Sequence, residues 1–319
     1  MLWLLAIVAV VGAIYFVGPR VPVDATISFD AASIGGDPVA YLAQRESAYD
    51  NIRDGLQKEI VWANPATRAR TPLAIVYVHG FSASKGEVRP LPDIVAARLG
   101  ANIFYTRLTG HGQDGLALAS ATVNHWINDL AEALAIGRMI GDEVVVMATS
   151  TGGGLAVWAA SQPALMEKVR ALVLVSPNLA IQNFGAALLT GPWGGQIANL
   201  VSGGERGFNP RNDKQAHFWT TRYPTAATLP VAAVARLARE SAADKARVPA
   251  LFVISDNDRV VNPLVTRTVA ALWGAPHELV TVNDADDADN HVLAGDALSP
   301  STTMRLADKT VDWLAALPR

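Results

Sequence analysis

The chain has 319 residues, of which 50% are hydrophobic and 17% charged, and its formal net charge is −3. This composition is typical of a globular protein with enough apolar material for one large core. The slightly acidic balance argues against nucleic acid as a partner. The sequence contains no cysteine, which excludes disulfides, cysteine-ligated zinc and thiol catalysis.

The first 18 residues differ in character from the rest of the chain. They contain no charged side chain and no proline, and the sequence Pro19-Arg20-Val21-Pro22 follows them. As a helix they would extend about 27 Å, close to the hydrocarbon thickness of a bilayer. We therefore expect residues 1–18 to be a hydrophobic membrane anchor, which predicts a membrane-associated protein with a single N-terminal span. A cleaved signal peptide, with export, and a core helix are the alternatives.

Beyond this segment, apolar runs alternate with amphipathic ones. Short runs rich in Val, Ile and Leu predict buried strands, and runs with apolar residues three or four apart predict helices. The expected strands cover residues 56–62, 72–78, 102–106, 143–148, 171–175, 250–254 and 277–282, and the expected helices cover 91–99, 123–136 and 305–317. Strands that alternate with helices predict a mostly parallel central sheet with helices on both faces.

The alternation stops between residues 177 and 248. This interval is far longer than the usual connection of about 2–6 residues between elements. It contains glycine-rich turns and apolar patches. We expect it to be a helical cap or lid insertion over the C-terminal edge of the sheet.

The most informative segment is residues 144–154, VVVMATSTGGG, in which an apolar run ends in a serine between small residues. This is the sequence form of a nucleophile elbow, a sharp strand-to-helix turn that exposes the hydroxyl of the central serine. Gly152 is small enough for the turn, whereas Ala148 stands where the usual G-x-S-x-G pattern has its first glycine. Ser150 is therefore the candidate nucleophile, and a simple helix cap is the alternative interpretation.

A serine nucleophile needs a histidine to take its proton and a carboxylate to orient that histidine. Asp258 lies in the acidic loop after the expected strand 250–254, and His291 follows the last expected strand. We take Asp258 as the acid and His291 as the base. Asp256, in the same loop as Asp258, is better explained as a helix-capping or solvated residue. The acidic residues at 284–289 match no calcium-binding template.

Acyl transfer also requires hydrogen-bond donors for the developing oxyanion. One donor is expected to be the backbone N–H of Thr151, the residue after the nucleophile. The other is expected in the loop after strand 72–78, which reads HGFSAS from residue 79, and we assign it to the N–H of Phe81. His79 is expected to brace this loop.

Taken together, these motifs resemble those of α/β-hydrolases of the lysophospholipase, monoacylglycerol lipase and carboxylesterase kind. The matching pieces run in the family's order from about residue 55 onward: His79-Gly80-Phe81, Gly110-His111-Gly112, Trp126-x-x-Asp129-Leu130, the elbow at Ser150, Asp258-x-Val260-Val261 and His291. The resemblance implies an α/β-hydrolase fold, and we assign residues 19–319 to this domain, with the interval at about 177–248 as its cap. It also implies that His111 braces a loop.

The expected function is that of a serine hydrolase with a Ser-His-Asp triad and an acyl-enzyme. Its substrate would be a small-molecule carboxylic ester, with the apolar cap and anchor favouring an amphiphilic acyl compound. Neither a metal nor an organic cofactor is required, and the oligomeric state is left open. The alternatives are an acyltransferase, a thioester or amide hydrolase that uses the same triad, and a catalytically silent scaffold that acts as a binding module.

Overall fold

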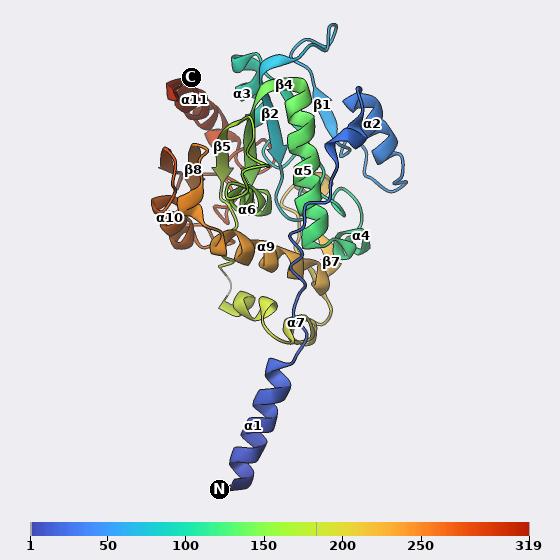
Figure 1. Ribbon diagram of the computed structural model, residues 1–319, viewed down its shortest axis with the longest axis vertical. Helices are drawn as coiled ribbons and strands as arrows, with labels where there is room; N and C mark the ends of the chain where they lie inside the picture. The colour runs from blue at the N-terminus through green and yellow to red at the C-terminus, as the bar shows by residue number, and fades with distance from the viewer. Residues whose placement is uncertain (1, 183, 319) are drawn as a thin grey trace.

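A computed structural model describes residues 2–182 and 184–318. Its centre is a seven-stranded sheet with the strand order β1-β3-β2-β4-β5-β8-β9 (Figure 1). The strands are Glu59–Val61 (β1), Thr71–Val78 (β2), Asn102–Tyr105 (β3), Gly141–Thr149 (β4), Val169–Val175 (β5), Ala250–Ile254 (β8) and His277–Thr281 (β9). β1 runs antiparallel to β3, and the other neighbouring pairs are parallel.

The helices of the main body connect these strands. They are Pro38–Glu46 (α2), Leu91–Leu99 (α3), Gly115–Ser120 (α4), Val123–Ile140 (α5), Ser150–Ala159 (α6), Pro263–Ala271 (α10) and Pro300–Ala316 (α11), with a 3-10 turn, Ala31–Ile34 (η1), ahead of α2. Local sequence fixes several of their ends. The hydroxyl of Thr122 accepts from the N–H of His125 at the start of α5, and α3 stops where Gly100 takes a left-handed conformation.

Successive residues of each central strand point to opposite faces, so the sheet has two apolar layers. In β2, Ala74, Val76 and Val78 belong to a core shared with α5, α6, the helix α9 (Thr228–Glu240) and α10. The alternating residues Ile75 and Tyr77 belong to a second core shared with α3 and α11. Such strands are buried on both faces, which explains their unbroken apolar sequence. The predicted mostly parallel sheet with helices on both faces is confirmed.

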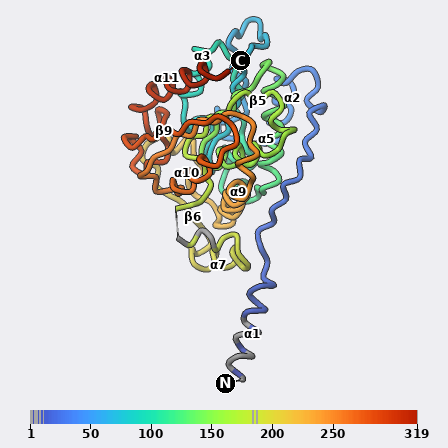
Figure 2. The backbone as a smooth tube through the Cα atoms, turned by 60° about the vertical axis from the view of Figure 1, so that its left-hand side comes forward, coloured from blue at the N-terminus to red at the C-terminus, as the bar shows by residue number. Residues whose placement is uncertain are grey.

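The interval between β5 and β8 holds short elements followed by a long helix. These are Phe184–Thr190 (η2), Gly194–Ser202 (α7), Glu205–Gly207 (β6), Asp213–Phe218 (α8), Arg222–Pro224 (β7), Thr225–Ala227 (η3), α9 and Ala243–Lys245 (η4). β6 and β7 pair as an antiparallel hairpin. α7 lies at the end of the body from which the first helix projects, whereas α9 runs across the body and contributes Val234 to its core (Figures 1 and 2).

The N-terminal segment corrects one expectation. The helix α1 covers Leu2–Phe16, 15 residues, and no helix within residues 2–182 and 184–318 is long and apolar enough to cross a membrane. A helix of that length extends about 22 Å, whereas a bilayer's hydrocarbon core is about 30 Å thick. The chain after α1 contacts the body, since the carbonyl of Pro19 accepts a 2.8 Å hydrogen bond from the N–H of Trp193. The predicted localisation with a single membrane span at residues 1–18 is therefore wrong.

The order of the strands determines where loops from distant parts of the chain meet. β3 lies on one side of β2 and β4 on the other, so the chain reverses its direction of travel across the sheet between β3 and β4. In open α/β sheets, ligands bind outside the carboxyl ends of the strands at such a switch point. The loops after β2, β4, β8 and β9 all open at this edge, and they carry the residues singled out from the sequence.

Candidate active site

Ser150 lies at the turn from β4 into α6. Its φ of +51° is in the left-handed region, a strained conformation for a residue with a side chain. Gly152 lies against the neighbouring strand, where a Cβ would come within 2.3 Å of the carbonyl oxygen of Val78. Ala148, in place of the usual first glycine, is fully packed in the core, so the turn accommodates its methyl group. The geometry is that of a strained strand-to-helix elbow with a serine at its apex.

Replacing Gly152 by alanine is expected to destabilise the protein by about 1–3 kcal/mol, because the backbone of β2 must move to admit the new methyl group. The measurement is urea unfolding of the purified variant. Gly36→Ala is the matched control, since a Cβ at Gly36 meets nothing within 4 Å. Equal midpoints for wild type and Gly152→Ala would contradict the tight elbow.

Three side chains form a continuous hydrogen-bonded chain at the carboxyl edge of the sheet. The Oγ of Ser150 lies 2.9 Å from the Nε2 of His291, and the Nδ1 of His291 lies 2.8 Å from the Oδ2 of Asp258. The other carboxylate oxygen of Asp258 accepts from the N–H groups of Val260 and Val261, at 2.8 and 2.9 Å. These contacts assign the proton of neutral His291 to Nδ1, which leaves Nε2 free to accept from the serine hydroxyl.

Burial and charge act in opposite directions on the base. Burial of His291 lowers its pKa, but the carboxylates of Asp258, Glu87 and Asp287 together more than offset this effect, and the pKa of His291 is raised above its usual value. A histidine that gains a proton readily beside a carboxylate is suited to remove a proton from Ser150. Asp256 lies outside this arrangement: its side chain is 46% exposed and pairs with Arg267 at 2.6 Å.

Asp287, which sequence reasoning did not single out, holds the loop that carries the base. One of its carboxylate oxygens accepts from the backbone N–H of His291 and of Val292, both at 3.0 Å. The other oxygen pairs with Arg211, which also binds Asp289 at 2.6 Å. Through Arg211, the interval between β5 and β8 is linked to the loop that carries His291. The run of aspartates around Asp287 is the one sequence signal that could have indicated such a role.

The two residues expected to supply oxyanion donors, Thr151 and Phe81, both line the cavity at the candidate nucleophile. Thr151 is the second residue of α6, so its N–H belongs to the first helical turn, whose amides have no partner within the helix. Neither a backbone nor a side-chain acceptor for the N–H of Phe81 is found among the described residues. Both residues line the same cavity as Ser150 and His291. Their amides are available to bind an oxygen that develops negative charge.

The loop with Phe81 is braced from behind by a histidine. The Nε2 of His79 accepts a 3.1 Å hydrogen bond from the N–H of Leu108, and its Nδ1 donates to the carbonyl of Gly80 at 2.8 Å. Complete burial lowers the pKa of His79 to about 4. It therefore stays neutral at physiological pH and keeps both hydrogen bonds, in accordance with the bracing role expected for it.

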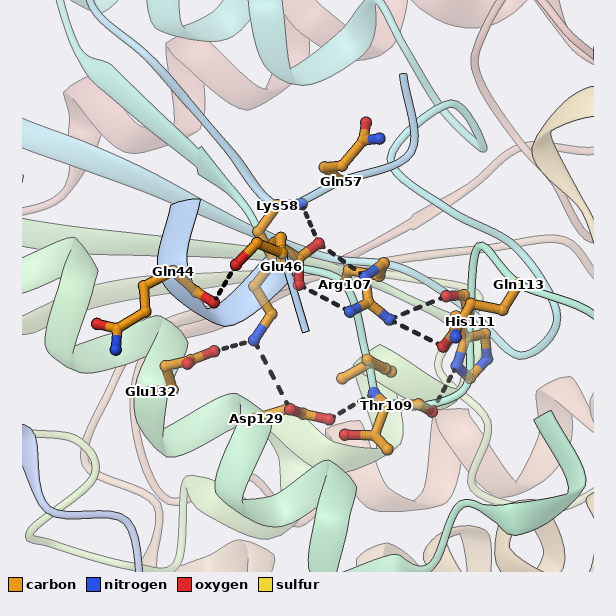
Figure 3. A network of polar contacts seen from close by, with 12 residues as sticks. Gln44, Glu46, Gln57, Lys58, Arg107, Thr109, His111, Gln113, Asp129 and Glu132 are labelled. Atoms are coloured by element: carbon orange, nitrogen blue, oxygen red, sulfur yellow. Dashed lines mark hydrogen bonds and ion pairs between the residues drawn. The ribbon is translucent and has the colours of Figure 1, made fainter. Parts of the chain in front are cut away.

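His111 and its neighbours are held by a buried polar network (Figure 3). The guanidinium of Arg107 binds both carboxylate oxygens of Glu46, at 2.7 and 2.8 Å, and donates to the carbonyl of His111 at 3.1 Å. On the other side of the loop, Asp129 accepts a 2.6 Å hydrogen bond from the N–H of Thr109.

The same network reaches the long helix and the N-terminal part of the domain. Lys58 pairs with Glu132 and lies 3.8 Å from Asp129, both on α5 (Figure 3). The indole N–H of Trp126, also on α5, donates to the carbonyl of Thr109 at 3.0 Å. The motifs around His111 and Trp126 thus meet in space, and they fix the loop on which His79 rests.

A cavity of about 960 Å³ opens beside Ser150. Apolar residues of η2 and α7, together with the segment before them, form one wall: Ile181, Leu188, Leu189, Ile197, Ala198 and Val201. Polar residues line the cavity as well: Arg206, Asn209, Arg211 and Asp289. The volume lies within the range of small-molecule sites, about 300–1,000 Å³. A molecule with an apolar arm and a polar end would match a lining of this mixed kind.

Comparison with known proteins agrees with the fold. Residues 75–297 match the alpha/beta hydrolase family. The chain is 28% identical over 203 residues to a thermostable monoacylglycerol lipase from Bacillus sp. (strain H-257), a match that covers 63% of this chain and 76% of that protein.

Solved structures show the same fold. A structure of the metagenome-derived lipolytic enzymes LipS and LipT has a TM-score of 0.66 at 20% identity and covers 83% of this chain and 100% of that one. A soluble variant of monoglyceride lipase from Saccharomyces cerevisiae has a TM-score of 0.61 at 15% identity, with 81% and 90% covered. At these identities the likeness shows a shared fold.

Proposed function

The chain belongs to the alpha/beta hydrolase family, and from this premise we propose that it is a serine hydrolase that cleaves carboxylic esters. The observation that carries the proposal is the hydrogen-bonded chain from Ser150 through His291 to Asp258, which ends at the cavity. A hydroxyl that donates to an imidazole beside a buried carboxylate is the arrangement that activates serine for acyl transfer. The lipase relatives support the same reaction class.

In the proposed reaction, the Oγ of Ser150 attacks the ester carbonyl while the Nε2 of His291 takes its proton. The negative charge that develops on the carbonyl oxygen is stabilised by the N–H groups of Phe81 and Thr151. The imidazolium, stabilised by Asp258, then gives its proton to the departing alcohol. Water attacks the acyl-enzyme with His291 as base, which restores the free serine and releases the acid.

The proposed substrates are amphiphilic acyl esters, such as a monoacylglycerol or a lysophospholipid. The apolar wall from η2 and α7 would bury the acyl chain, and the polar residues near Arg206 would meet the head group. The Bacillus relative, a monoacylglycerol lipase, supports this substrate class. We propose that the segment at about 177–248 acts as a cap, with η2 and α7 as its substrate-facing part.

The proposal predicts a preference for longer acyl chains. Burial of each additional methylene stabilises the complex by about 0.8 kcal/mol, so kcat/KM should rise by up to about fourfold per methylene until the apolar wall is covered. The measurement is a series of p-nitrophenyl esters of increasing length, with Ser150→Ala as the blank. A flat or falling series would contradict the acyl-binding role of the cap.

Two residues of α7 provide a matched pair of variants. Ile197 lines the cavity, whereas Leu200 does not line it and is 85% exposed. Ile197→Ala should reduce kcat/KM for long esters and leave short ones unchanged. Leu200→Ala should leave both unchanged. Equal effects of the two substitutions would place the acyl chain elsewhere.

A further inference from the structure

Glu87 is a buried carboxyl for which the proposed reaction has no use. It lies in the loop between β2 and α3 and is 2% exposed. Its Oε2 accepts a 2.7 Å hydrogen bond from the N–H of Gly80, the residue before Phe81. The same oxygen lies 3.0 Å from the hydroxyl of Tyr77, which also lies 3.2 Å from the hydroxyl of Thr149. This carboxylate oxygen thus links Tyr77 near the end of β2 to the loop that holds Gly80 and Phe81, called here the oxyanion loop. Through Tyr77 it is also linked to Thr149, the residue before the nucleophile.

The other oxygen of Glu87 lies on the same side of Gly80 as the nucleophile. Within residues 2–182 and 184–318, no hydrogen bond to its Oε1 is found, and Glu87 lines the same cavity as Ser150. A Cβ on Gly80 would lie 2.6 Å from this oxygen and 3.0 Å from the Cβ of Ser150. The absence of a side chain at Gly80 therefore lets the carboxyl of Glu87 approach the serine.

The charged groups around Glu87 do not neutralise it. Tyr77 on β2 and His291 in the loop after β9 are the titratable groups that act on its carboxyl. The two cationic side chains of its own loop pair with other carboxylates: Lys85 with Glu59 at 2.6 Å, and Arg89 with Asp93 at 2.7 Å. Burial raises the pKa of Glu87 to about 7. This carboxyl therefore changes its charge near neutral pH.

We propose that Glu87 is a positioning residue of this site. It holds the oxyanion loop through the N–H of Gly80, and its charge acts on His291 and on the two oxyanion donors, the N–H groups of Phe81 and Thr151. The proposal rests on the proposed hydrolase function. Because the N–H of Gly80 and the hydroxyl of Tyr77 both lie at Oε2, we assign the proton of neutral Glu87 to Oε1, on the side of Gly80 where Ser150 lies. Ionised Glu87 instead adds a negative charge there, next to the place where the carbonyl oxygen develops its own.

The charge of Glu87 also reaches the base. Burial lowers the pKa of His291, while Asp258, Glu87 and Asp287 raise it. Asp258 binds the imidazole directly, and Asp287 is paired with Arg211. Glu87 is the member of this group without a direct bond to His291 and without a cation beside it among the described residues. Removal of its charge should lower the pKa of His291 and keep that histidine in its basic form at lower pH.

The decisive variant is Glu87→Gln, which keeps an acceptor for Gly80 and Tyr77 but cannot ionise. We expect the acid limb of the pH profile of kcat/KM, and of the rate of fluorophosphonate labelling, to move to lower pH by several tenths of a unit to about one unit. Glu143→Gln is the control, because Glu143 lies near the start of β4, at the end of the strand away from Ser150, and pairs with Arg170. Superimposable profiles for Glu87→Gln and wild type would overturn the electrostatic part of the proposal.

The variant Glu87→Ala tests the positioning part. It removes the acceptor of the Gly80 amide, and misplacement of one oxyanion donor should lower kcat by about 10²-fold with KM within about twofold. An unchanged kcat would overturn this part. If the alanine variant does not fold, the kcat of Glu87→Gln is measured in its place. We expect a kcat near that of the wild type, because the glutamine still accepts from the N–H of Gly80. A hundredfold loss would contradict this, since it would show that an amide acceptor does not hold the oxyanion loop.

Thermal unfolding separates this proposal from the proposed function. The pKa of Glu87 is raised in the folded state, so the wild type loses stability relative to Glu87→Gln as pH rises from about 4.5 to about 7, and the difference is constant above that range. The Tm of Glu87→Gln minus that of wild type should therefore increase across this range. A wild type that hydrolyses no ester but shows this increase would refute the function alone. Active enzyme with a Tm difference independent of pH would refute the role of Glu87.

Discussion

Replacement of Ser150 by alanine is expected to reduce ester hydrolysis by about 10⁵–10⁶-fold in kcat. In the proposed mechanism Ser150 forms the covalent bond to the acyl group, and its Oγ lies 2.9 Å from the Nε2 of His291. His291→Ala should cost a similar factor, and the double variant should be no worse than either single one, because the two residues act as a unit. Initial rates on a short soluble ester measure these effects.

The control for this prediction is the folded state of the variants. Ser150→Ala should retain the circular dichroism spectrum of the wild type and a similar Tm, because the serine hydroxyl makes its hydrogen bond to His291 alone among the described residues. Turnover by a folded Ser150→Ala variant at a tenth of the wild-type rate would mean that another group performs the attack.

Asp258→Asn is expected to reduce kcat by about 10³–10⁴-fold. The carboxylate of Asp258 accepts from the Nδ1 of His291 at 2.8 Å. In the proposed mechanism it stabilises the imidazolium that forms when the serine is deprotonated. An amide in its place cannot offer the same charge, and its N–H₂ group can favour the wrong tautomer of the histidine. The loss should appear in kcat/KM across the pH range in which His291 is neutral.

Asp256→Asn provides a matched comparison for this substitution. Both aspartates lie in one loop, but Asp258 is 3% exposed, whereas the side chain of Asp256 is 46% exposed and pairs with Arg267. Exposed ion pairs contribute little, about 0–1 kcal/mol. Asp256→Asn should therefore change kcat by less than about threefold. Equal losses for the two variants would show that Asp258 is not the acid of the site.

Much of the fold could be predicted because its strands are buried on both faces. Residues such as Ile75 and Val76 in β2 pack against different helix layers, so the whole strand is apolar and can be recognised without periodicity. The antiparallel direction of β1 had no such signal, since its three residues are half-buried. The short elements between β5 and β8 were also beyond prediction, because three-residue strands such as β6 depend on the partner with which they pair.

The N-terminal error has a physical cause as well. Apolar composition over residues 1–18 indicated a span, but the helix ends at Phe16, and the carbonyls of Ile14 and Pro19 are bound by Trp193 from a distant part of the chain. Composition carries no information about such a long-range contact. Hydropathy alone therefore overestimated the length of the helix.

The candidate site was predictable where residue order and residue type sufficed. Ser150, Asp258 and His291 follow β4, β8 and β9, and parallel strands bring their carboxyl ends to one edge. Glu87 and Asp287 could not be found in this way. Each is an ordinary acidic residue in a loop, and its role depends on burial and on backbone amides that the fold brings within reach.

The most direct test of the account is the reaction of the purified protein with a fluorophosphonate, followed by peptide mass spectrometry. We predict a single adduct on the peptide that contains Ser150, complete loss of labelling in Ser150→Ala, and slow labelling in His291→Ala. Folded wild-type protein that is not labelled, or labelling that persists in Ser150→Ala, would contradict the assignment of Ser150 as the nucleophile.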